Sequence, residues 1–239
     1  MTHSSKKTLV RPGLRMSDLV FENPALLRLM EHMQMDFLVH DHTVSQVCAA
    51  HGIREGLFIM LCNLYNGHHP ATHEIDAVNA EELTSVVDLL KQAHRYYTEE
   101  QYPAITKLIK ALQVLNSRPE IGLVETFFAE YFAEVLEHLN YEDEIAFPYI
   151  IGLTTHQAGD GLFSVKEYLD HHTDIESKLS DLKALLLQHI EVEEDRKVRR
   201  MLLIALTDLE TDLEIHSLIE EQILIPVVER MERSISHER

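Results

Sequence analysis

Histidine and glutamate recur at one fixed spacing in the C-terminal two thirds of the chain. Glu142 follows His138 by four residues, and Glu220 follows His216 by four residues. A proline comes next at the same distance in both segments, so each reads His, three residues, Glu, five residues, Pro. Imidazole nitrogens and carboxylate oxygens are ligands that suit iron, zinc and manganese. The two segments therefore predict metal chemistry.

The segments belong to an internal repeat with an offset of 78 residues, which is 216 − 138. Subtracting this offset from position 172, a histidine, leads to His94. The histidines at 94 and 172 also precede the His-x3-Glu segments by the same 44 residues. His171 lies beside His172 and is the alternative ligand, but the repeat selects His172. The repeat predicts a pseudo-twofold helical bundle.

A spacing of four residues suits an α-helix, because residues i and i+4 lie on one face about 5 to 6 Å apart at Cβ. Two such helices and one histidine from each of two others would deliver four nitrogens and two carboxylates into a bundle core. Each carboxylate could bridge two cations there. We therefore expect a dinuclear site, with coordination positions left for dioxygen or nitric oxide, whose ligands are His94, His138, Glu142, His172, His216 and Glu220.

The elements that must position these ligands are helices. Glycine and proline are scarce, with 8 and 7 copies in 239 residues, and 45% of the chain is apolar, which indicates an all-α fold with a substantial core. Capping boxes begin helices at Asn79, with Glu82, and at Ser164, with Glu167. Pro103 predicts a kink. We expect an up-down-up-down four-helix bundle with helices at about 79–115, 120–147, 164–189 and 193–231.

A small helical domain is expected before the bundle, at residues 14–66. One helix should begin at Asn23-Pro24 and another at Thr43, where a capping box with Gln46 is predicted. The sequence NGHHPATHEIDAVN breaks the helical pattern, so residues 67–79 are expected to form a linker before the bundle at 80–232. The linker histidines, His68, His69 and His73, are expected on a solvated surface loop. The alternative is that they bind a second metal.

The composition also limits the kinds of partner. A net charge of −19 disfavours general binding to nucleic acid or to an anionic membrane. No apolar run is long enough to span a bilayer, and the N-terminus lacks the apolar core of a signal peptide, so we expect a cytoplasmic protein. Cys48 and Cys62 are too few for a disulfide framework and are expected to be buried.

Several residues near the expected ligands have two interpretations. Tyr97, Tyr131 and Tyr168 could donate hydrogen bonds to ligand carboxylates or could be ordinary core residues. The acidic neighbours of the ligands, which are Asp143, Glu144 and Glu221, are expected on the solvated face of their helices. His189 is expected at the end of a helix, where the helix dipole favours a histidine.

The repeat, together with His94 in AHRYYTEEQYP and His172 in HHTDIE, resembles the hemerythrin-like proteins over residues 80–232. Within them, the chain looks closest to the repair-of-iron-centres group. The resemblance implies two iron ions in an oxo- or hydroxo-bridged centre, with zinc or manganese as the alternatives. It implies that the four histidines are terminal ligands and that Glu142 and Glu220 are bridges.

The N-terminal segment also looks like the small helical domain that precedes the bundle in many repair proteins. In that family, Asp-Phe is commonly followed by Cys-Cys-Gly-Gly, whereas here Asp36-Phe37 is followed by LVHD. A thiol role for this domain is therefore not expected. The alternative is that His40 and His42 bind a metal there.

The resemblance implies repair of damaged iron-sulfur proteins, or a response to nitric oxide or oxygen stress. The alternative is a sensor that binds dioxygen or nitric oxide reversibly and signals through its N-terminal domain. Neither the oligomeric state nor an enzymatic activity follows from the sequence.

Overall fold

The protein is described here by a computed structural model that covers residues 7–116, 119–155, 165, 168, 175–189 and 196–237. Every regular element within these ranges is a helix. The one β pairing among them is an isolated bridge between Arg15 and Thr43. The predicted all-α fold is confirmed.

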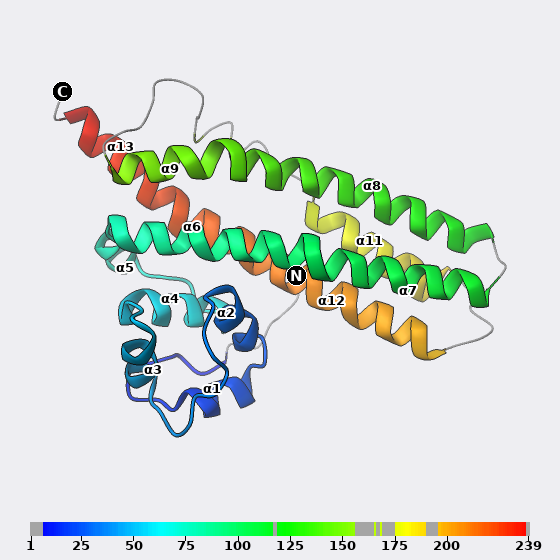
Figure 1. The fold of residues 1–239 in the computed structure, drawn as a ribbon, viewed down its shortest axis with the longest axis horizontal. Coiled ribbons are helices and arrows are strands. Elements are labelled where there is room, and N and C mark those ends of the chain that lie inside the picture. Colours follow the sequence, from blue (N-terminus) through cyan, green and yellow to red (C-terminus); the bar gives the residue numbers. More distant parts are fainter. Residues whose placement is uncertain are drawn as a thin grey trace. The chain divides into compact units, whose positions relative to one another are not determined.

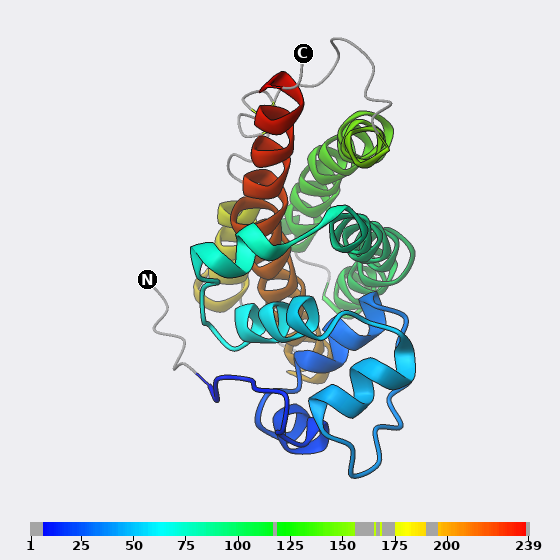
Figure 2. The same ribbon diagram turned by 90° about the vertical axis from the view of Figure 1, so that its left-hand side faces the viewer.

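Four short helices form the N-terminal part of the described chain, and Figure 2 shows them gathered into one cluster. The predicted capping box is present at the third of them, where the Thr43 and Gln46 side chains each accept from the other's backbone N–H. Gly52 ends this helix with φ +68°, which glycine adopts without steric cost. The helices are α1 (Met16–Glu22), α2 (Leu26–His32), α3 (Val44–His51) and α4 (Glu55–Tyr65).

The predicted linker at 67–79 contains a short helix, α5 (Thr72–Ala77), that its glycine, proline and polar residues did not suggest. Arg230 donates hydrogen bonds to the backbone carbonyls of Ile75, at 2.9 Å, and Val78. This contact ties the end of α5 to the last helix of the chain. The predicted division into an N-terminal domain, a linker and a bundle remains a prediction.

The bundle helices follow the predicted ranges closely, but three of them contain a π-helical turn. The Asn79 capping box is confirmed: Asn79 N–H donates to Glu82 Oε2 at 2.9 Å, and Glu82 N–H donates to Asn79 Oδ1 at 3.0 Å. The predicted start at Ser164 lies outside the described residues. The segments in order are α6 (Ala80–Arg95), η1 (Tyr96–Gln101), α7 (Tyr102–Leu115), α8 (Pro119–Tyr141), η2 (Glu142–Ala146), α9 (Phe147–Thr154), α11 (Ile175–Gln188), α12 (Arg196–Ile219), η3 (Glu220–Leu224) and α13 (Ile225–His237).

The described chain forms two compact units, of which the second comprises residues 93–148 and 160–214. In this unit α7, α8, α11 and α12 run side by side with alternating direction (Figure 1), which confirms the up-down-up-down arrangement. Lys178 of α11 pairs with Glu134 of α8, and Lys183 of α11 pairs with Glu210 of α12. Each of the four helices contributes to one apolar core, whose fully buried members include Ile109, Val124, Leu186 and Leu206.

The other unit comprises residues 1–92, 149–159 and 215–239 as far as these are described. It contains α1 to α5, most of α6, and α13. None of the described helices is long and apolar enough to cross a membrane.

Candidate metal centre

Two of the three π-helical turns begin at a predicted ligand. Residue Glu142 opens η2 and Glu220 opens η3. In η2 the N–H of Phe147 donates to the carbonyl of Glu142, five residues earlier, and in η3 the N–H of Ile225 donates to the carbonyl of Glu220. The two halves of the sequence repeat therefore share a backbone irregularity as well as their residues.

Proline explains where the π turns occur. Proline lacks an N–H and its ring clashes with the carbonyl four residues earlier in an α-helix. Pro103, Pro148 and Pro226 each stand two residues after a π turn, and the carbonyl that each would meet belongs to a residue inside that turn. The wider turn lets the helix pass the proline without ending. At Pro103, where a kink is predicted, the structure has such a turn, η1.

The carboxylate of Glu142 lies between two imidazole rings. Its Oε2 atom is 3.1 Å from Nε2 of His94, and its Oε1 atom is 3.3 Å from Nε2 of His138. Glu142 is fully buried, His94 is 3% exposed, and the His138 side chain is 11% exposed. A buried carboxylate is costly without a cationic partner. Glu142 therefore presents one oxygen to each of two histidines, and these are donor types that suit a metal ion.

Two neighbouring residues hold this cluster in place. The hydroxyl of Tyr168 donates to Oε1 of Glu142 at 2.9 Å in a buried hydrogen bond. Nδ1 of His94 lies 3.1 Å from Oδ1 of Asp143. The Asp143 carboxylate can only accept, so a proton on Nδ1 leaves the lone pair of His94 Nε2 available to a metal. The His94 ring also stacks on Phe147, with ring centroids 5.4 Å apart.

These contacts decide some of the open interpretations. The hydrogen-bonding role is confirmed for Tyr168, while Tyr97 and Tyr131 are buried in the core. The predicted solvated position of Asp143 is confirmed, since its side chain is 42% exposed, but its carboxylate also orients His94, which the sequence did not indicate. Asp143 follows Glu142 directly in the chain, and His94 of α6 lies beside the Asp143 carboxylate. Glu144 and Glu221 are exposed as predicted.

The second His-x3-Glu pair lies in the other compact unit. Nε2 of His216 is 3.2 Å from Oε1 of Glu220, with the same i,i+4 geometry as His138 and Glu142. Glu220 is fully buried and His216 is 5% exposed. This pair therefore repeats the local structure of the first, as the 78-residue offset predicts.

Two of the predicted positions cannot be compared with the structure. His172 and its alternative His171 both lie outside the described residues, so the choice between them remains a prediction. His189 is exposed one residue beyond the end of α11, in agreement with its predicted place at a helix end.

The remaining histidines named as alternatives have other contacts. Nε2 of His68 is 2.8 Å from the carbonyl of Lys7, and Nδ1 of His69 is 2.9 Å from the amide oxygen of Gln222. The rings of His40 and His42 lie 5.5 Å apart near the surface. Among the described residues, none of these histidines belongs to a group of three metal-ligating side chains.

Both cysteines are buried, as predicted, and neither is in a disulfide. Burial raises the pKa of the Cys48 thiol to about 11, with a smaller contribution from the charge of Glu55. Burial also raises the pKa of Cys62 well above its ordinary value. Thiolates are therefore scarce at neutral pH, and the N-terminal helices offer no reactive sulfur.

The donors described above fit a metal site: imidazole nitrogens and fully buried carboxylates that lie on helices. No curated protein matches the chain. The family model of the hemerythrin HHE cation binding domain matches residues 85–228, more than half of the chain and the whole stretch from η1 to η3. The chain therefore belongs to the family of proteins with a hemerythrin HHE cation-binding domain.

Proposed function

We propose that the chain holds a non-haem di-iron centre with His94, His138, Glu142, His172, His216 and Glu220 as ligands. The observation that carries the proposal is the buried Glu142 carboxylate, which directs one oxygen toward each of two histidines. The second His-x3-Glu pair has the same local geometry and the same π turn, which supports a second bridging carboxylate at Glu220.

His172 is included in the proposed ligand set only because the 78-residue repeat relates it to His94. Replacing His172 with alanine is expected to lower the metal content, whereas His171→Ala, its matched control one residue away, should leave the metal content unchanged. If the two variants show the reverse, His171 is the ligand and the repeat has been read one residue out of register.

Two iron ions held by imidazole and carboxylate supply one-electron chemistry and open positions for dioxygen or nitric oxide. Zinc or manganese would suit the same donors, but zinc has no redox chemistry. The residues of the chain keep this site buried, orient His94 through Asp143 and hold Glu142 through Tyr168. We propose that the protein acts in repair of damaged iron-sulfur clusters or in the response to nitric oxide and oxygen stress, with damaged iron-sulfur proteins as its partners.

A sensor is the second candidate, and one observation favours it. The buried cysteines of α3 and α4, with their raised pKa values, offer no thiol for transferring iron or sulfur from the N-terminal helices. Those helices would then serve to contact a partner after dioxygen or nitric oxide binds reversibly at the metal.

A reactivation assay separates the two functions. An iron-sulfur enzyme whose cluster has been damaged by nitric oxide is incubated with the iron-loaded protein. The controls are the zinc-loaded protein and the Glu142→Ala, Glu220→Ala double variant. If the protein repairs clusters, the activity of the enzyme should return with the iron-loaded protein and with neither control. If activity does not return while nitric oxide or dioxygen binds and dissociates reversibly, the protein is a sensor.

A further inference from the structure

The first part of α12 has an unusual distribution of charge. Residues 196–200 contain four bases, residues 201–207 contain no charged side chain, and residues 208–214 contain four acids. Bases in the first turn of a helix oppose its dipole, and α12 has no acidic residue there. The stability of α12 alone does not account for this order. The charged positions are Arg196, Lys197, Arg199, Arg200, Asp208, Glu210, Asp212 and Glu214.

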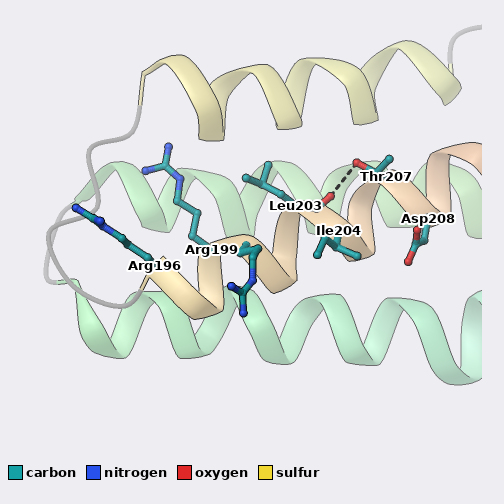
Figure 3. A pocket seen from close by; sticks show the side chains of 7 residues that line it. Arg196, Arg199, Leu203, Ile204, Thr207 and Asp208 are labelled. Carbon is teal, nitrogen blue, oxygen red and sulfur yellow. Dashed lines mark hydrogen bonds between the residues drawn. The ribbon is translucent and has the colours of Figure 1, made fainter. Parts of the chain in front are cut away.

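Four of these eight residues, Arg196, Arg199, Arg200 and Asp208, lie along an open surface. A shallow groove of about 440 Å³ follows α12, and the described residues that line it all come from this helix. Figure 3 shows these side chains from the arginines at one end, past Leu203 and Ile204, to Thr207 and Asp208 at the other. Ile204 is 53% exposed and Met201 is 44% exposed. A second helix can pack its apolar face against exposed apolar side chains of this kind.

The arginines have no acidic partner within the described part of the chain. Arg196, Arg199 and Arg200 form no ion pair there, although the protein carries a net charge of −19. On the acidic half, Glu210 pairs with Lys183 and Asp212 is buried, whereas the side chains of Asp208 and Glu214 are exposed. The exposed surface of α12 is therefore basic at one end and acidic at the other.

We propose that this surface is a homodimer interface in which α12 packs antiparallel on α12 of a second copy. The midpoint of positions 200 and 208 is 204, so a twofold axis at Ile204 places Arg200 opposite Asp208 of the second copy, and the reverse. The two Ile204 side chains then meet at the centre. A twofold interface must be complementary to itself, and this charge order satisfies that condition.

The dimer should dissociate readily on dilution. A single pair of helices buries less than the roughly 1,200 to 2,000 Å² of stable complexes. The like net charge of the two copies also opposes association. The proposed interface includes none of the predicted metal ligands, so a test of the dimer does not depend on the proposed function.

Charge reversal tests the interface, with mass measured by light scattering and analytical ultracentrifugation over a dilution series of the full chain. Arg200→Asp leaves acids at both positions and Asp208→Arg leaves bases at both, so each variant alone should be monomeric. An equimolar mixture of the two should dimerise, because each chain then meets its opposite. The double variant Arg200→Asp, Asp208→Arg should dimerise by itself.

Two control variants carry the same net charge as the single reversals but leave α12 unchanged. Lys110 on α7 and Glu130 on α8 are exposed, so the variants Lys110→Asp and Glu130→Arg should dimerise as the wild type does. Circular dichroism checks that each variant is folded. A wild type that stays monomeric at every concentration, or single reversals that leave the dimer intact, would overturn the proposal. Failure of the mixed variants to associate would also exclude this pairing and favour another acidic partner.

Discussion

At the scale of single residues, the account depends on how Glu142 is held. Its carboxylate faces His94 and His138 and accepts a hydrogen bond from Tyr168. A metal ligand that is fixed in this way needs little reorganisation to bind a cation, and partners of this kind are typically worth about 10- to 100-fold in metal affinity.

Tyr168→Phe is therefore expected to weaken metal binding by about 10-fold while leaving the bundle folded. The change removes only the hydroxyl that donates to Glu142. Competition with a chelator measures the effect. Tyr149→Phe is the control, because its hydroxyl donates at 2.7 Å to Glu232, which is not one of the predicted ligands. Equal metal affinity in the two variants would show that Tyr168 is only a packing residue.

The two cysteines give a prediction about pH. A thiol with its pKa raised to about 11, as in Cys48, stays protonated in the folded state at pH values where the unfolded chain already releases its proton. This contribution to stability is fully present below about pH 9 and is lost as pH rises toward 11. Native protein at pH 8 should therefore resist alkylation by iodoacetamide, and urea should expose both thiols, as counted by mass spectrometry. Rapid labelling of either thiol without urea would contradict the buried assignment.

At the scale of elements, each π turn accommodates one extra residue within a helix. The wider turn absorbs that residue, so the helix on either side keeps its apolar face toward the core. After η2, Phe147, Ile150 and Leu153 are buried on one side of α9. The sequence contained the signal for these turns, a proline at a fixed distance after each ligand pair, but helical periodicity alone does not distinguish a π turn from a kink.

Deletion of Ile145 from η2 is expected to lower the free energy of unfolding by about 3 kcal/mol. The shortened turn would become α-helical, and the ring of Pro148 would then clash with the carbonyl four residues before it. Ile145→Ala is the matched control, since it removes the side chain and keeps the π turn. Urea unfolding compares the two variants. A deletion variant as stable as Ile145→Ala would mean that the helix does not need the π turn to accommodate the proline.

At the scale of the whole molecule, the parts that sequence predicts well are those with local causes. The helices and the capping boxes at Thr43 and Asn79 follow from neighbouring residues, and the structure has them. The contact of Asp143 with His94 joins residues 49 positions apart, so no local pattern indicates it. Helix α5 was missed for a related reason, because Arg230, 152 positions from Val78, helps to hold its end.

Metal analysis of the whole protein decides whether the chain holds two iron ions. The protein, purified from iron-replete cells, is measured by elemental analysis and visible spectroscopy, together with the Glu142→Ala, Glu220→Ala double variant. We expect about two irons per chain and the ferric absorption of an oxo-bridged pair in the wild type, and the loss of both from a double variant that remains helical. Zinc alone or no metal in the wild type, or two irons retained by the double variant, would contradict this expectation.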